Sequence, residues 1–304
     1  MNLLIIKKKN FLALLVVILI LIVVITVNKR NTLQTIAPID STKNIDADLT
    51  CDGQNEHMEF IRKDNTIDLN ISHNSNSTYL SSKINDNILF SLNNHWSPKI
   101  YLYDLSRDIK PEIILQGVKE SKSICYIFSW KDDKFQNLYS SDKNIFGILD
   151  SKNNKTPQCF SLSASKGNSS LNSFMIINNE VLDTTNDTFT IPSLNNITNF
   201  IKLIETPYEL DDLPDIFSAK IDKTDLATLW NLDKENYSYS FQDAFFYDYD
   251  WDSYSNATSL KWRLTFEKNK LKGEEGDKSE VIFYLDSMIE DSNFKIVSIN
   301  KIKS

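Results

Sequence analysis

One apolar run near the start of the chain constrains its architecture most. Residues 11–27 read FLALLVVILILIVVITV, seventeen residues without a charge and with only Thr26 as a polar side chain. A helix of this length rises about 25 Å, at about 1.5 Å per residue, which is close to the thickness of a bilayer core. Because Leu, Ile and Val insert favourably into lipid, we predict a transmembrane helix over residues 11–27.

The charges that flank this run predict its orientation. Three lysines precede it, and Lys29 and Arg30 follow it. The excess of basic residues before the run favours a cytoplasmic N-terminus, residues 1–10, and an extracytoplasmic C-terminal part. A cleaved signal peptide is the alternative, but its apolar core would be about 7–15 residues long and would end at a small-residue cleavage site. We therefore predict an uncleaved single-pass anchor in the cell membrane, with too few residues inside for a cytoplasmic signalling module.

The outer part of the chain is acidic. Five of the 33 basic residues flank the run, so 28 basic residues and all 41 acidic residues lie in residues 31–304, a net charge of −13. Nucleic acid is not an expected partner, because neutralising phosphates requires clustered Lys and Arg. Attraction to an anionic lipid surface is disfavoured for the same reason. Bound cations would suit this charge better.

The first half of the outer part is predicted to be β-rich. Residues 28–44 are polar and unpatterned, and are expected to link the anchor to a repeat region, residues 45–190. Short stretches of alternating apolar residues, separated by Asn, Asp and Ser clusters, predict strands there. These stretches are Glu56–Ile61, Thr66–Ser72, Lys99–Leu105, Glu112–Gln116, Ser123–Trp130, Phe135–Ser140 and Ile145–Leu149.

A helix and a β-meander are predicted after residue 190. Ser193 is a candidate N-cap, and apolar residues recur at helical spacing from Leu194 to Ile204. Residues 191–214 are therefore expected to form a helix and a linker, followed by an α+β domain, residues 215–304. That domain begins with a short helix whose Leu226, Leu229 and Trp230 point inward. The predicted strands are Tyr237–Tyr249, Ser259–Lys268, Ser279–Met288 and Phe294–Ile302. The predicted class is mainly β with a few helices, α+β.

Three segments of the repeat region share a layout. Residues 48–56, 104–112 and 150–158 each have an acid at position 1, Asp or Asn at position 5, and Glu or Gln at position 9. In the first two segments the residues at these positions are acidic: Asp48, Asp52, Glu56, Asp104, Asp108 and Glu112. Recurrence at intervals of 56 and 46 residues is consistent with repeated β units.

These segments resemble the loop of FG-GAP or VCBS repeats, which reads roughly D-x-[DN]-G-D-G-x-x-[DE]. The resemblance covers about residues 45–165, and implies blades of a β-propeller whose loops often hold calcium. The whole chain, including YSFQDAFFYDYDW, resembles clostridial, Gram-positive VCBS-repeat-containing membrane-anchored proteins of unassigned function. With six glycines and 304 residues, the chain is too poor in glycine and too short for a full ring. The expected form is a truncated, propeller-like array.

Two interpretations of the acidic loops remain open. Calcium takes about six to eight oxygen ligands, and alternating short acids in a tight loop supply several of them. Position 3, however, is Thr50, Ser106 or Lys152, which are weaker ligands or repel a cation. The second interpretation is that the acids cap turns by accepting hydrogen bonds from their own backbone. Calcium at the first or second loop is the cofactor hypothesis.

An acidic and aromatic segment is the candidate glycan contact. Asp248, Asp250, Trp251 and Asp252 lie in FFYDYDWDSYSN. Aromatic faces stack on sugar rings, and carboxylates bind hydroxyls or act as acid and base. The alternative is a strand with a packed aromatic face that ends in a solvated acidic turn.

Signatures of common enzymes are missing from the sequence. It has no G-x-S-x-G, no H-E-x-x-H and no P-loop. Three scattered histidines and three cysteines have no metal-ligand spacing, and the odd number of cysteines predicts no disulfide framework. We therefore expect an extracytoplasmic binding or scaffolding protein of the bacterial cell envelope, whose partner is an envelope protein or a glycan. The alternative is an envelope polysaccharide hydrolase that uses carboxylates within residues 243–252.

Overall fold

The computed structural model describes residues 35–39, 44–73, 76–149, 156–186, 188–207, 212–272 and 278–303. Over these ranges the chain is mainly β with two α-helices, which is the predicted α+β class. The predicted anchor, residues 11–27, and the segment before it lie outside the described residues. Within the described ranges, no helix combines the length and the apolar character that a bilayer crossing requires.

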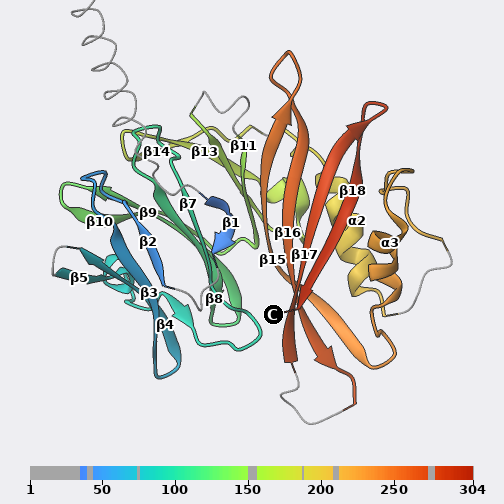
Figure 1. Ribbon diagram of the computed structural model, residues 1–304, viewed down its shortest axis with the longest axis horizontal. Coiled ribbons are helices and arrows are strands. Elements are labelled where there is room, and N and C mark those ends of the chain that lie inside the picture. Colours follow the sequence, from blue (N-terminus) through green and yellow to red (C-terminus); the bar gives the residue numbers. More distant parts are fainter. Residues whose placement is uncertain are drawn as a thin grey trace, which may run out of the picture.

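Three antiparallel meanders, each of four strands, form the N-terminal part (Figure 1). The first contains β2 (Ile45–Ala47), β3 (Glu56–Lys63), β4 (Thr66–His73) and β5 (Asn76–Tyr79). The second contains β7 (Lys99–Tyr103), β8 (Glu112–Lys119), β9 (Lys122–Lys131) and β10 (Lys134–Ser141). The third contains β11 (Ile145–Leu149), β12 (Gln158–Leu162), β13 (Asn172–Ile177) and β14 (Glu180–Asp183).

Each predicted repeat segment occupies the same place in one meander. Residues 48–55 connect β2 to β3, residues 104–111 connect β7 to β8, and residues 150–157 connect β11 to β12. The common spacing of acids therefore marks the connection between the first and second strands of three successive units. Residues 150–155 of the third connection lie outside the described residues.

Two short strands extend the first two meanders. β6 (Phe90–Ser91) pairs with β4, and β1 (Thr35–Ile39) pairs antiparallel with β7. Part of the segment expected to be a linker thus adds an edge strand to the second meander.

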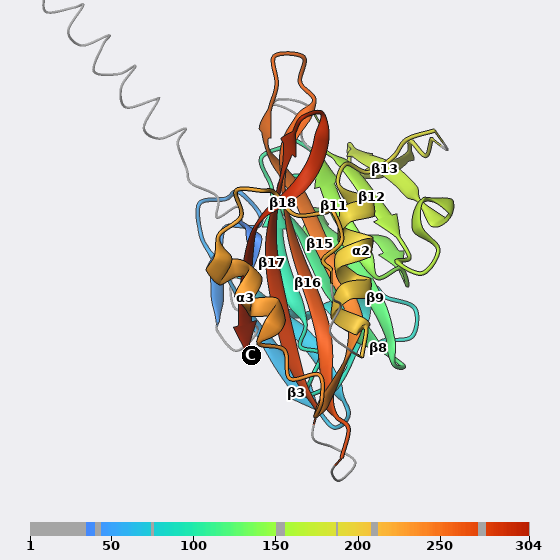
Figure 2. The same cartoon turned by 90° about the vertical axis from the view of Figure 1, so that its right-hand side faces the viewer.

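A long meander and two helices form the C-terminal part. The strands are β15 (Tyr237–Trp251), β16 (Ala257–Lys270), β17 (Lys278–Glu290) and β18 (Asn293–Lys303), each within a few residues of its prediction. Figure 2 shows α2 (Leu194–Glu205) and α3 (Lys223–Trp230) on one face of this sheet. The predicted apolar stripe of α2 is buried against Trp262, Phe266 and Phe283.

One inward-facing residue of α3 was predicted wrongly. Leu229 is buried, but the side chain of Trp230 is 45% exposed. Successive helical residues are separated by about 100°, so a helix of this length that buries Leu229 turns the next side chain toward solvent.

The repeat region and the C-terminal meander share a sheet. β11 runs parallel to β15, so the order is β14-β13-β12-β11-β15-β16-β17-β18. Strands that precede and strands that follow residues 191–214 in sequence thus belong to one sheet, although the sequence suggested a helix and linker between two regions there. The junction requires a glycine at position 147, because the Phe246 ring lies where a Cβ would be.

The second meander packs against the face of the C-terminal sheet that the helices leave open. Tyr101, Ile114 and Ile127 of that meander are buried with Phe146 of β11 and Phe245 of β15. We call this contact the seam. Cys125 and Cys159 are buried in it as free thiols, and Cys51 is also free.

Candidate functional site

The first two repeat loops are closed by their ninth residue. Glu56 Oε2 accepts hydrogen bonds from the backbone N–H groups of Leu49 at 2.6 Å and Thr50 at 3.2 Å. In the second loop, Glu112 Oε2 accepts from Leu105 at 2.6 Å and Ser106 at 3.4 Å. Both glutamates are buried, and burial raises the pKa of Glu112 to about 7.

The other two acids of each loop also accept backbone N–H groups. The first acid accepts from the sixth residue and the fifth acid from the seventh, as the turn-capping interpretation predicted. These bonds join Gly53 to Asp48, Ile109 to Asp104, Gln54 to Asp52 and Lys110 to Asp108, at 2.8–3.0 Å. The backbone matches too, because Cys51 and Arg107 at the fourth position both have φ 59°.

The loops differ in the oxygens left for a cation. In the first loop, Asp48 Oδ1 and Thr50 Oγ1 are buried and have no partner among the described residues. In the second loop, both carboxylate oxygens of Asp104 accept backbone N–H groups. Among the described residues the second loop retains only the buried hydroxyl oxygen of Ser106, whereas the first loop retains a carboxylate and a hydroxyl oxygen, at its first and third positions.

His73 lies beside the first loop. Its Nδ1 is 2.6 Å from Glu56 Oε1, and its Nε2 is 4.0 Å from Asp52 Oδ2. With Glu56 committed to His73 and two backbone N–H groups, it is not available as a cation ligand. Over the described part of the chain, no three His, Cys, Asp or Glu side chains are grouped to hold a metal ion.

The predicted glycan-contact residues gather at the end of the β15–β16 hairpin. Asp248 is 5% exposed and accepts a hydrogen bond from Trp251 Nε1 at 2.7 Å, and burial raises its pKa to about 6. Asp250 Oδ1 accepts the backbone N–H of Trp251 at 3.0 Å. Asp252 caps the turn by accepting from Tyr254 at 2.8 Å. A bulge between Asp248 and Asp250 breaks the strand alternation that would have placed all three carboxylates on one face.

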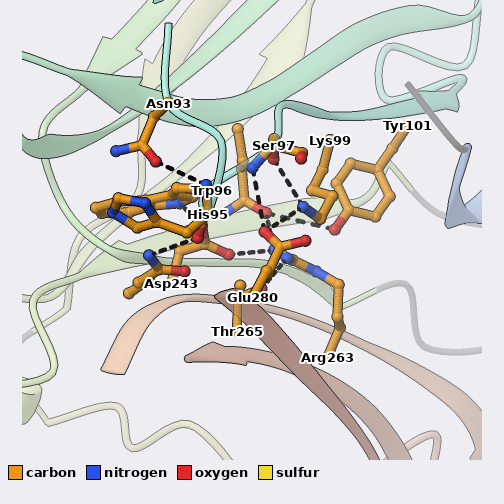
Figure 3. Close-up of polar contacts among 12 residues, drawn as sticks. Asn93, His95, Trp96, Ser97, Lys99, Tyr101, Asp243, Arg263, Thr265 and Glu280 are labelled. Carbon is orange, nitrogen blue, oxygen red and sulfur yellow. Dashed lines mark hydrogen bonds and ion pairs between the residues drawn. The ribbon is translucent and has the colours of Figure 1, made fainter. Parts of the chain in front are cut away.

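A buried ion pair lies in the seam (Figure 3). Arg263 Nη2 is 2.6 Å from Asp243 Oδ1 and 2.8 Å from Gln116 Oε1, and all three side chains are at most 3% exposed. Trp96 Nε1 donates to the other oxygen of Asp243. Burial lowers the pKa of Arg263, but the adjacent Asp243 carboxylate outweighs it and holds the pKa above its ordinary value.

A second buried pair lies next to the first in Figure 3. Lys99 Nζ is 2.8 Å from Glu280 Oε1, and the same oxygen accepts the backbone N–H of Ser97 at 3.2 Å. Burial lowers the pKa of Lys99, and Glu280 opposes this shift. Together the two pairs join residues 96–99 and β8 to β15, β16 and β17. Removing one partner of either pair would leave the other charge buried without a counter-ion, so the two ion pairs hold the seam in this arrangement.

A cavity of about 330 Å³, which we call the seam cavity, opens beside this network, on the same face of the sheet. Its walls are built from residues two apart on four consecutive strands, because alternate residues of a strand share a face. The pairs are Phe245 and Tyr247, Lys261 and Arg263, Tyr284 and Asp286, and Ser298 and Asn300. Tyr101 of β7 completes the wall and stacks on Phe245, with ring centroids 3.9 Å apart.

Sequence reasoning missed this cavity. None of the predicted glycan-contact residues lines it, although Phe245 and Tyr247 belong to the same strand. The period-two pattern of β15 to β18 shows which residues share a face. What the pattern does not show is that Tyr101, more than a hundred residues earlier, covers one end of that face.

Comparison with known proteins gives little further guidance. No protein-family model matches the chain, and no curated protein matches its sequence. One solved structure with a partly similar arrangement is described as an "Ntf2 like protein involved in plasmid conjugation". It is 8% identical, and the match covers 69% of this chain and 79% of that chain with a TM-score of 0.25. At that TM-score the likeness assigns neither a fold nor a function.

Proposed function

We propose that this chain is a single-pass, membrane-anchored binding protein of a bacterial cell envelope, without catalytic activity. Its body lies outside the cytoplasm, and its ligand is a short glycan held in the seam cavity. The observation that carries the proposal is the composition and support of that cavity.

The lining suits a sugar ring. Tyr247 and Tyr284 offer aromatic rings, while Asp286 and Asn300 can exchange hydrogen bonds with hydroxyls. A volume of about 330 Å³ is at the small end of ligand sites, about the size for one or two sugar units. Because the lining side chains stand on paired strands and a fixed seam, the site is organised before the ligand arrives.

The test is a calorimetric titration of the full-length protein in detergent micelles. Soluble fragments of cell-wall glycan are the probes, and glucose oligomers are the unrelated control. Tyr284→Ala should weaken binding at least tenfold, because it removes an aromatic wall. Tyr254→Ala is the matched control, since Tyr254 is 85% exposed on the hairpin turn and lies outside the cavity. Failure of every glycan fragment to bind, or equal binding by Tyr284→Ala, would refute the proposal.

An envelope polysaccharide hydrolase is the second candidate, and Asp248 is the observation that favours it. A buried carboxyl group with a pKa of about 6 retains its proton near neutral pH better than an ordinary aspartate, as a general acid must. The test incubates the protein with envelope polysaccharide and measures new reducing ends. Turnover that Asp248→Asn abolishes would establish this candidate and displace the non-catalytic proposal.

We also infer that the three meanders form an open array of propeller-like units, and that calcium binds the first loop. Asp48 Oδ1 and Thr50 Oγ1 support this assignment, with Asp52 as the next ligand and water for the rest. Calcium bound only to the folded state should raise the melting temperature. Identical melting curves in calcium and in a chelator would refute calcium binding. A calcium-dependent shift in Asp48→Asn equal to that of the wild type would refute binding at the first loop.

A further inference from the structure

Large exposed apolar side chains gather at one end of the molecule. We call this the loop end, because the repeat loops 48–56 and 104–112 lie there and touch through Cys51 Sγ and the Ile109 carbonyl at 3.1 Å. Apolar side chains at the loop end are 38% to 85% exposed: Ile109, Ile177, Val181, Leu182, Tyr254, Met288 and Ile289.

Strand pairing places these residues together. The segment that leads through β7 runs in the same direction as β15, since Trp96 contacts Asp243, Tyr101 stacks on Phe245 and Tyr103 lies near Asp248. The turn with Tyr254 therefore lies beyond the loop that follows β7. Met288 pairs with Ser259 next to that turn, and the β13–β14 hairpin turns after Ile177, two residues past the level of Gln158. In Figure 1 the β15–β16 and β17–β18 hairpins both project toward the top of the view.

The chain also enters the fold near this end. Thr35, the first residue of β1, pairs with Leu102 close to the loop end of β7, whereas Ile39 pairs with Ile100. Only residues 28–34 separate Thr35 from the predicted end of the anchor at Val27. An extended chain of that length spans at most about 28 Å.

The length of this tether is comparable to the distance that the β15–β16 hairpin extends beyond the level of Thr35. Tyr101, next to the partner of Thr35, lies level with Phe245, and Trp251 is six residues further along β15. Six residues of strand extend about 20 Å. Because the tether holds Thr35 within about 28 Å of the membrane, a hairpin of this length allows its tip to reach the lipid surface.

We propose that the loop end lies against the lipid surface of the membrane that holds the anchor, with its apolar tips in the headgroup region. This orientation rests on the proposed anchor. Tyrosine and aliphatic side chains are stable at that interface, where one part of a ring is apolar and the other wet. The loop end also carries exposed acids, including Asp52, Asp108 and Asp291. It therefore fits zwitterionic headgroups better than anionic ones. In this orientation the seam cavity faces sideways, and its ligand approaches parallel to the membrane.

Site-specific fluorescence in proteoliposomes tests the orientation. The full-length protein carries Cys51→Ser, and one residue at a time is changed to cysteine and labelled with an environment-sensitive fluorophore. The test sites are Tyr254 and Ile289 at the loop end. The control sites are Leu271 and Ile302, which are 54% and 45% exposed and lie at the opposite ends of β16 and β18. Cys125 and Cys159 are fully buried and stay unlabelled.

Phosphatidylcholine vesicles with brominated acyl chains should quench the labels at Tyr254 and Ile289 at least twofold, and leave the control labels unchanged. Replacing a third of the lipid with phosphatidylglycerol at low salt should reduce that quenching. Protein that does not float with the vesicles would overturn the anchor, and the orientation with it. Floating protein whose Tyr254 and Ile289 labels are not quenched, or whose four labels are quenched equally, would overturn the orientation alone. Labels shielded from aqueous iodide but not quenched by bromine would assign the loop end to a contact with a second copy of this protein instead.

Discussion

Arg263 shows how strongly one residue can depend on its neighbours. The side chain is 3% exposed, in contact with Asp243, Gln116 and Thr265. A buried guanidinium is tolerated only where a carboxylate and further acceptors replace its water. None of these partners is close to Arg263 in sequence except Thr265. The sequence alone therefore left Asp243 as a carboxylate in a loosely defined acidic region, and gave no role to Arg263.

Removing one partner of this pair should be costly. Asp243→Ala should lower the free energy of unfolding by about 3–5 kcal/mol, because the Arg263 charge remains buried without a counter-ion. Urea denaturation of each variant measures the change. The double variant Asp243→Leu with Arg263→Met should recover at least about 2 kcal/mol of that loss, since no charge is then buried. A double variant less stable than Asp243→Ala would show that the unpaired Arg263 charge is not the source of the loss.

Asp248 should make stability depend on pH in an unusual direction. Its pKa is raised from 3.8 to about 6 in the folded protein, so the folded state binds more protons than the unfolded state between these values. The contribution of protonated Asp248 to the free energy of unfolding is complete below about pH 4 and is lost as the pH rises through about 6. It amounts to at most about 3 kcal/mol.

Comparison with Asp248→Asn isolates this contribution, because asparagine does not titrate. Urea denaturation at pH 4.5 and pH 7 gives the free energy of unfolding of both proteins. The advantage of the wild type over the variant should be larger at pH 4.5. An equal difference at both pH values would mean that burial of Asp248 does not shift its pKa.

At the scale of the element, alternation and turn chemistry were sufficient for most strands. β3, β4, β9 and β11 begin and end within about two residues of the predicted bounds, because each buries one face or both against a core. β12 to β14 were not predicted. β14 in particular is exposed at all four residues, so its pattern holds no buried face to recognise.

The repeat loops show why a motif can persist when its glycines do not. The sixth position has φ 91° at Gly53 and φ 73° at Ile109, a region that a β-branched residue rarely adopts. The loop hydrogen bonds hold Ile109 in that conformation.

Replacing Ile109 with glycine should therefore stabilise the protein. Ile109 is 71% exposed, so little burial is lost, and relief of backbone strain should raise the free energy of unfolding by about 1 kcal/mol. Thermal and urea unfolding measure the gain. Ile302→Gly is the matched control, because Ile302 is also exposed but lies in a regular strand, where glycine should destabilise. A loss of stability in Ile109→Gly would show that the loop does not strain this residue.

At the scale of the whole molecule, the parallel pair β11–β15 is the feature that local patterns could not predict. Nearly a hundred residues separate Ile145 from Ala244, and two helices lie between them in sequence. Each strand has the composition of a buried strand, but neither sequence indicates which strand it pairs with. The seam cavity depends on the same long-range contact, so its residues could be assigned to strands but not assembled into a site.

This continuity predicts that the described part of the chain unfolds in one step. The eight-stranded sheet and the two buried ion pairs leave no boundary at which the repeat region could separate from the C-terminal meander. Far-ultraviolet circular dichroism and tryptophan fluorescence should therefore give coincident urea transitions.

Gly147→Ala tests the junction, because the new methyl group must displace the Phe246 ring. It should cost about 1–3 kcal/mol and shift both transitions together. Gly167→Ala is the control: its Cβ meets no neighbour, so it carries only the cost of φ 55°. If Gly147→Ala, or the wild type itself, separates the two transitions, the repeat region and the C-terminal meander are independent folding units joined by an edge contact.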